Sequence, residues 1–112
     1  MRFRTALLSL AFFPLLMNRA AAQAPTGKDL YDANCKKCHG VLGAPPKVMK
    51  VKFPKLVPFD AAYIAKNNQD AIVTVLTKGK GNDMKPFKDK LSPAQMASVA
   101  QYVKELATRP RS

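Results

Sequence analysis

Three reactive side chains lie within five residues, and they constrain the fold more than any other feature of the sequence. Cys35, Cys38 and His39 form a C-x-x-C-H pattern, and they are the only cysteines and the only histidine among the 112 residues. In a helix the two thiols stand about one turn apart and the imidazole follows directly, so the three side chains can serve one bound group. A chain of this size buries only about two thirds of its surface and depends on such an internal staple.

Other uses of these three side chains fit the sequence less well. A structural zinc site needs four ligands drawn largely from Cys and His, and the chain has three such residues. A thioredoxin-like dithiol would follow a strand, which no alternating pattern indicates, and a Cys35–Cys38 disulfide would close too small a loop to stabilise much. The pattern instead predicts one covalently attached haem, with thioethers from Cys35 and Cys38 and an axial imidazole from His39.

A haem iron with one imidazole has a sixth position, which sulfur or a second imidazole usually fills in a small carrier. There is no second histidine, and the methionines beyond residue 22 are Met49, Met84 and Met96. Met96 lies on the apolar stripe of the expected last helix, and Met49 follows His39 by only ten residues. Met84 lies in a loop between two glycines and Pro86, which can present sulfur from the other side of the ring. The predicted sixth ligand is therefore Met84.

Capping residues and helical spacing predict an all-α fold. The expected helices follow the capping residues Thr26, Asp60, Asn68 and Ser92. The last helix carries an apolar stripe at helical spacing, which consists of Met96, Val99, Ala100, Val103, Leu106 and Ala107. Residues 40–59 are rich in proline and lack a sustained period, so we expect an irregular loop that wraps the bound group.

Residues 1–22 are predicted to be a cleaved secretory signal peptide, which leaves residues 23–112 as the folded domain. Two early arginines precede an apolar stretch over residues 6–17, and three alanines at 20–22 suit a signal peptidase. An uncleaved membrane anchor is the alternative, but a proline and Arg19 interrupt a segment that is already too short. Export would place the domain in the periplasm, an oxidising compartment.

The charge of the domain is strongly positive. Without the three arginines of residues 1–22 the chain has 16 basic and seven acidic side chains, which favours acidic protein partners. Nucleic acid is a poorer match, because export separates the two and the lysines lack interleaved aromatic residues. No apolar run reaches the roughly 18 residues of a membrane span, so an integral membrane protein is not expected. Lys37, Lys80 and Lys85 lie close in sequence to the predicted ligands, and we expect the docking surface there.

These motifs, in this order over residues 26–107, resemble those of small bacterial mono-haem cytochromes c of class I. The resemblance implies an all-α class I cytochrome c fold, with three to four helices around one covalent haem c. In that family the first and last helices cross at a small residue and aromatics, which implies a contact of Gly27 and Tyr31 with Tyr102. The resemblance also implies a methionine ligand in the loop before the last helix, which agrees with Met84.

Two details of the family pattern are less clear in this sequence. A proline carbonyl after the attachment motif accepts a hydrogen bond from the histidine, and either Pro45 or Pro46 can take that role here. The ligand methionine is often followed directly by proline, whereas Lys85 separates Met84 from the next proline here.

The expected function is single-electron transfer rather than catalysis, because an iron with two axial protein ligands has no open position for a substrate. We expect a monomer that forms transient complexes with acidic redox partners. Two alternatives remain: a permanent cytochrome subunit of a periplasmic dehydrogenase or oxidase, and a haem-based ligand-binding or peroxidase-like module. The first would need a large apolar docking patch, and the second would need a weak or absent sixth ligand.

Overall fold

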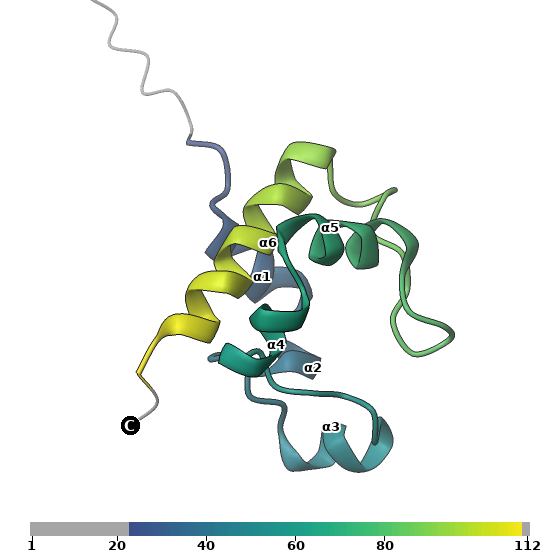
Figure 1. Ribbon diagram of the computed structural model, residues 1–112. Helices are drawn as coiled ribbons and strands as arrows, with labels where there is room; N and C mark the ends of the chain where they lie inside the picture. Colours follow the sequence, from purple (N-terminus) through teal and green to yellow (C-terminus); the bar gives the residue numbers. More distant parts are fainter. Residues whose placement is uncertain (1–22, 111–112) are drawn as a thin grey trace, which may run out of the picture.

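The computed structural model describes residues 23–110, and it is all helical, as predicted (Figure 1). Its six helices are α1 (Gly27–Asn34), α2 (Lys36–His39), α3 (Lys47–Lys52), α4 (Ala61–Lys66), α5 (Gln69–Lys78) and α6 (Pro93–Thr108). Within these residues the only β-type pairing is an isolated bridge between Lys80 and Met84. The predicted signal peptide lies outside the described residues.

Side-chain caps begin four of the helices where the sequence predicted them. Thr26 and Ser92 each form a capping box with the residue three positions on, which fixes the starts of α1 and α6. Asp60 and Asn68 accept hydrogen bonds of 2.9 Å from backbone N–H groups at the starts of α4 and α5. Each cap satisfies an N–H group that the helix itself cannot pair, so these four helices begin at defined residues.

The core forms where α1 crosses α6. A Cβ atom on Gly27 would overlap the carbonyl oxygen of Ser98, so only glycine lets the two backbones approach this closely. Beside this contact the rings of Tyr31 and Tyr102 meet edge-on, with centroids 5.3 Å apart. The predicted crossing of Gly27 and Tyr31 with Tyr102 is confirmed.

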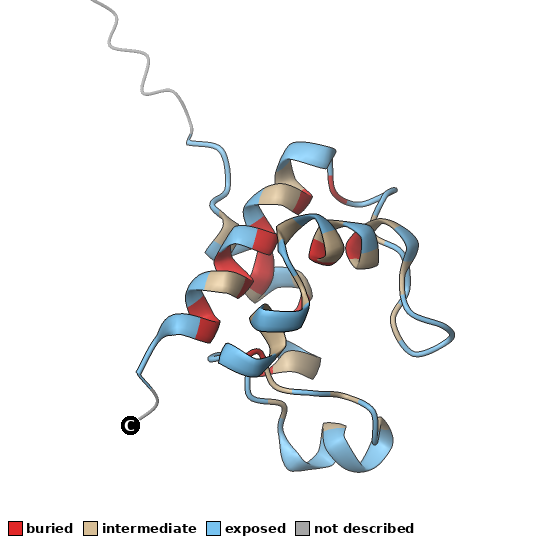
Figure 2. Cartoon of the chain, viewed as in Figure 1, coloured by how far each residue is buried: buried red, intermediate tan, exposed pale blue. Residues whose placement is uncertain are grey.

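Figure 2 shows the buried residues concentrated on the facing sides of α1, α5 and α6. All members of the predicted apolar stripe on α6 are buried, and these are Met96, Val99, Ala100, Val103, Leu106 and Ala107. This core holds α1, and with it the C-x-x-C-H segment, against the rest of the molecule.

The prediction that residues 40–59 are irregular throughout is wrong for α3. Pro46 precedes this helix, and its carbonyl accepts hydrogen bonds from the N–H groups of Met49 at 2.9 Å and Lys50 at 3.1 Å. Proline has extended backbone here, and its fixed φ suits the residue before a helix, so a proline-rich segment still forms one turn and a half.

Among residues 23–110, every helix is too short or too polar to span a membrane.

Candidate haem site

The attachment motif winds through a single helical turn. The N–H of Cys35 donates to the carbonyl of Tyr31 at 2.8 Å, which ends α1, and the N–H groups of Cys38 and His39 donate back to the carbonyl of Cys35 at 3.2 and 2.9 Å. Both thiols are free, with Cys35 buried and Cys38 half-buried. Burial raises the pKa of Cys35 to about 11. The structure therefore brings two thiols and an imidazole together on one short segment.

The imidazole of His39 stacks on the ring of Phe59, with centroids 4.7 Å apart and planes 18° from parallel. Its Nδ1 atom is buried and has no hydrogen-bond partner among residues 23–110. Burial also lowers the pKa of His39, which favours the neutral imidazole that a metal ion binds. A half-buried imidazole whose buried Nδ1 atom is left unpaired fits a group bound at this motif.

Phe59 and Gly43 are site residues that the sequence reasoning missed. The N–H of Phe59 donates to the carbonyl of Gly43 at 2.8 Å, and a Cβ atom on Gly43 would lie 3.0 Å from the Cβ atom of Phe59. The chain thus turns closely around the phenylalanine and holds its ring against His39. A glycine at positive φ and a phenylalanine 16 residues later carry no recognisable spacing signal.

Tyr31 ties the motif to the helix crossing. Its hydroxyl donates to the carbonyl of Gly40 at 2.7 Å, directly after His39, and the side chain is fully buried. Burial raises the pKa of Tyr31 well above its ordinary value, so the hydroxyl keeps its proton and remains a donor. The end of the motif is thereby fixed to the α1–α6 contact.

The expected hydrogen bond from His39 to the carbonyl of Pro45 or Pro46 is absent from this structure. The carbonyl of Pro46 already accepts two N–H groups at the start of α3, which commits that oxygen to the helix. The choice of Pro45 or Pro46 as the acceptor stays a prediction.

Met84 lies in the loop between α5 and α6, which two backbone contacts hold in place. The N–H of Lys80 donates to the carbonyl of Met84 at 2.8 Å, and the N–H of Met84 donates to the carbonyl of Lys80 at 3.2 Å. Gly79 has a positive φ of 72°, and a Cβ atom there would lie 2.8 Å from the nitrogen of Pro86. The side chain of Met84 is half-buried and packs against the core. This loop is therefore well defined, although it projects from the helices (Figure 1).

The other two methionines have structural surroundings of their own. Met96 is buried in the core on α6, where the Thr77 hydroxyl lies 3.7 Å from its sulfur. Met49 is half-buried on α3. The three lysines predicted to surround the site, Lys37, Lys80 and Lys85, are all exposed.

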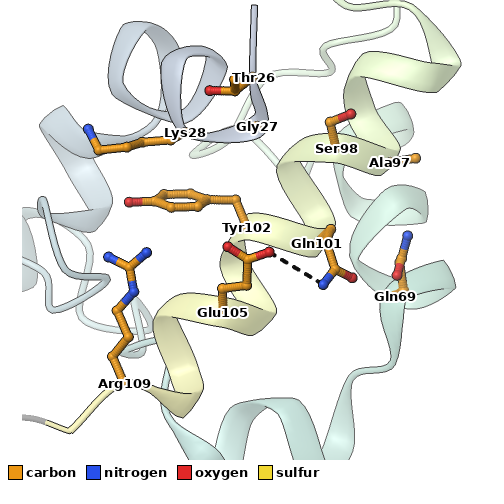
Figure 3. A pocket seen from close by; sticks show the side chains of 10 residues that line it. All are labelled: Thr26, Gly27, Lys28, Gln69, Ala97, Ser98, Gln101, Tyr102, Glu105 and Arg109. Atoms are coloured by element: carbon orange, nitrogen blue, oxygen red, sulfur yellow. Dashed lines mark hydrogen bonds between the residues drawn. The ribbon is translucent and has the colours of Figure 1, made fainter.

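A cavity of about 650 Å³ opens on another part of the molecule, between α1 and α6 (Figure 3). Its lining includes Lys28, Gln101, Glu105 and Arg109 but none of the cysteine, histidine or methionine candidates. Gln101 donates to Glu105 at 3.5 Å, and the Arg109 guanidinium lies over the Tyr102 ring. Because no candidate ligand lines it, this cavity is a surface groove separate from the candidate site.

The chain is similar to known proteins over most of its length. The family model described as "Cytochrome C oxidase, cbb3-type, subunit III" matches residues 22–103. Cytochrome c6 of Nostoc sp. is 33% identical over 103 residues, which cover 90% of this chain and 88% of that protein. The chain belongs to the cytochrome c family. Members of this family carry haem c, so this cytochrome has one covalently bound haem with its iron.

A further sequence relative and a solved structure are also similar to this chain. The cbb3-type cytochrome c oxidase subunit CcoP of Azospirillum brasilense is 34% identical over 88 residues, which cover 77% of this chain but 29% of that subunit. The solved structure of the KustC0563 c-type cytochrome superposes with a TM-score of 0.67 at 31% identity, covering 74% of this chain and 99% of that one. The predicted class I cytochrome fold is confirmed, but the described residues form six helices and not the three to four expected, because short helices also form in the segments around α3.

Proposed function

We propose that this cytochrome is a periplasmic single-electron carrier, with haem bound to Cys35 and Cys38 and iron held by His39 and Met84. One observation carries the proposal: two free thiols and an imidazole with a buried, unpaired Nδ1 atom share one helical turn, and the ring of Phe59 stacks on that imidazole. The haem iron supplies the one-electron redox chemistry. The protein residues determine where the haem is held and what can reach it.

His39 and Met84 would both hold the iron, which would leave no iron position for a substrate. That arrangement suits a carrier and not an enzyme. Both residues belong to well-fixed segments, since Phe59 packs on the imidazole and the Lys80–Met84 bridge holds the loop. Ligands that move little between redox states keep the reorganisation small, which favours fast electron transfer.

The proposed location rests on the N-terminal sequence, and the proposed partners rest on the positive charge of the chain. A secretory signal over residues 1–22 would deliver the domain to the periplasm. The excess of lysines, among them the exposed Lys37, Lys80 and Lys85, would attract partners with acidic surfaces.

Extraction of the haem tests the attachment. Acid and organic solvent should leave the colour with the polypeptide, because thioether bonds survive unfolding whereas ligation alone does not. Replacing both cysteines by alanine should make the haem extractable. A colourless wild-type polypeptide after extraction would show that Cys35 and Cys38 do not carry the haem.

A second candidate is a permanent subunit of an oxidase complex. The match to the cbb3-type subunit III model and to CcoP favours it, although the chain spans 29% of that subunit's length. The two functions differ in how electron transfer responds to salt, a measurement described in the Discussion.

A further inference from the structure

The segment that follows the attachment motif carries positive charge without any compensating acid. Residues 36–59 contain no Asp or Glu and hold six lysines: Lys36, Lys37, Lys47, Lys50, Lys52 and Lys55. Six of the 14 lysines beyond residue 22 therefore fall in a stretch of 24 residues. This segment therefore carries six positive charges that no acidic side chain within it offsets.

The same segment exposes apolar side chains. All the large hydrophobic residues that are exposed in the described part of the chain lie between 41 and 57, and they are Val41, Leu42, Val48, Val51 and Val57. Single exposed apolar residues are ordinary, but a cluster of them within one segment marks a surface that contacts a partner.

Helix α3 combines both features on its outer side. At about 100° per residue, Val48 and Val51 lie about 60° apart, and Lys47, Lys50 and Lys52 flank them. The valines are 67% and 82% exposed, whereas Met49 on the opposite side is half-buried. We call the set Lys47, Val48, Lys50, Val51 and Lys52 the α3 face.

The position of α3 makes this face accessible. Figure 1 shows α3 projecting from the body of the molecule, below α2 with its C-x-x-C-H residues. Within residues 23–110, α3 has no extensive contact with another helix. Since α3 begins eight residues after His39, a partner seated on it lies close in sequence to the candidate haem ligand.

We propose that the α3 face is the docking surface for an acidic redox protein, with the two valines at the centre of the interface and the lysines at its rim. The inference rests on the proposed function and gives the partner's surface: a small apolar patch ringed by carboxylates. An apolar centre with a charged rim is the usual anatomy of a transient interface. The charge selects the occupant, because a second copy of this chain would bring lysines against lysines.

An anionic membrane is a less suitable occupant than an acidic protein. Helices that lie on membranes insert Trp, Phe or Leu over a long apolar face, whereas α3 offers two valines over six residues. The test below includes a membrane arm.

The experiment compares electron-transfer rates of the holoprotein with two probes. Stopped flow follows one electron passing from reduced flavodoxin, a small acidic flavoprotein, to the oxidised cytochrome. Oxidation of the reduced cytochrome by hexacyanoferrate(III), a small anion that needs no apolar contact, serves as the second probe. The double variant Val48→Ser/Val51→Ser should react roughly tenfold more slowly with flavodoxin at all salt concentrations, and at the wild-type rate with hexacyanoferrate.

Charge reversal provides the second arm. Lys47→Glu/Lys50→Glu should slow the flavodoxin reaction more than tenfold at low salt, and the difference should shrink as salt rises. Lys90→Glu/Lys104→Glu makes the same change in net charge elsewhere and should slow the reaction at most about threefold. Val57→Ser is the matched apolar control, because Val57 is 52% exposed but lies outside α3, and its rate should equal that of the wild type.

Several results would overturn the proposal. A wild-type flavodoxin rate for the valine double variant would do so, as would a shift in its visible spectrum, which would make the valines part of the haem site. If only Lys80→Glu/Lys85→Glu slowed the reaction, docking would lie at the Met84 loop, and the carrier function would stand without the α3 face. Binding to phosphatidylglycerol vesicles that requires the valines, with an unchanged flavodoxin rate, would replace the protein partner by a membrane. Rates insensitive to salt and to every variant would contradict the proposed function as well.

Discussion

Phe59 connects the candidate axial histidine to the helical core. Its ring stacks on His39, meets Tyr31 edge-on with centroids 6.5 Å apart, and lies 5.0 Å from the ring of Tyr63. The rings of Tyr31, Tyr63 and His39 leave Phe59 little room to rotate, and Phe59 in turn holds one face of the imidazole. The orientation of this one ligand therefore depends on packing that begins in α1 and ends in α4.

Phe59→Ala should lower the free energy of unfolding by about 3–5 kcal/mol, because it leaves a cavity against His39 and Tyr31. Phe59→Leu should recover most of that loss, since an aliphatic side chain refills much of the volume. Guanidinium unfolding of the holoprotein, followed by circular dichroism, measures both. Phe53→Ala, at a half-buried position beside α3, is the control and should cost less than half as much. Equal losses at the two positions would contradict a special role for Phe59.

Met84→Ala should open the iron to added imidazole, cyanide or carbon monoxide and should lower the reduction potential, because a soft thioether stabilises the reduced iron. Met49→Ala and Met96→Ala should leave ligand binding unchanged, although the second should destabilise the core. Ligand titrations followed in the visible spectrum, together with a potentiometric titration, distinguish the three variants. If Met84→Ala binds no added ligand, the sixth ligand lies elsewhere.

Spacing alone predicted which residues could hold a haem, and it could not predict their supports. Cys35, Cys38 and His39 are adjacent in sequence, so their geometry is local and a motif captures it. Phe59 reaches His39 only because of the path taken by a proline-rich segment, and that path depends on contacts across the fold. The carbonyl of Pro46 accepts the first N–H groups of a short helix that no strong local signal indicates.

At the scale of elements, the crossing of α1 and α6 is the contact on which the others depend. Gly27 lies against the carbonyl of Ser98, and the adjacent Tyr31 reaches from the same helix to Gly40. A change at the crossing therefore alters both the core and the support of the motif. A larger residue at position 27 would not fit between the two helix backbones.

Gly27→Ala should destabilise the protein by about 1–3 kcal/mol or more, because the added methyl group forces the two helices apart. Gly81→Ala is the comparison, since a Cβ atom there meets no atom within 4 Å and only the positive φ of 56° costs energy, about 1 kcal/mol. Urea unfolding of both variants measures the difference. A Gly27→Ala protein as stable as the wild type would mean that the helices are not in such close contact.

The helices differed in how far the sequence could predict them. Thr26, Asp60, Asn68 and Ser92 cap helices at their expected places, because a cap and its N–H partners lie within four residues. Helix α3 has no side-chain cap and contains two β-branched valines, so local preference is weak. The helix forms directly after Pro46, whose fixed φ suits the residue before a helix.

At the scale of the whole molecule, the excess of positive charge is the main property that a partner meets at a distance. The proposed mature domain has 16 bases against seven acids, a margin that two ionised haem propionates would reduce without cancelling. Charge of one sign raises the rate of encounter with an acidic protein. The effect depends on ionic strength, which separates a free carrier from a fixed subunit.

The bimolecular rate with an acidic redox protein should fall as salt rises, while the screening length shortens from about 10 Å at 0.1 M to about 3 Å at 1 M. A permanent subunit is already docked, so its transfer rate should hardly change over moderate salt. Stopped flow across ionic strength measures the slope, with Lys80→Glu/Lys85→Glu expected to react more slowly at low salt and to show a flatter slope. A flat wild-type rate would favour the subunit over the carrier.

The contact between α1 and α6 joins the first and the last of the helices described between residues 23 and 110. A ribosome makes α1 well before α6, and the glycine-sized gap on the surface of α1 has no partner until α6 has been synthesised. The core therefore closes only after α6 has been made, and until then Tyr31, which holds the end of the motif at Gly40, lacks its contact with Tyr102. The order of synthesis thus gives the nascent chain an interval in which its cysteines are open to modification before the fold encloses them.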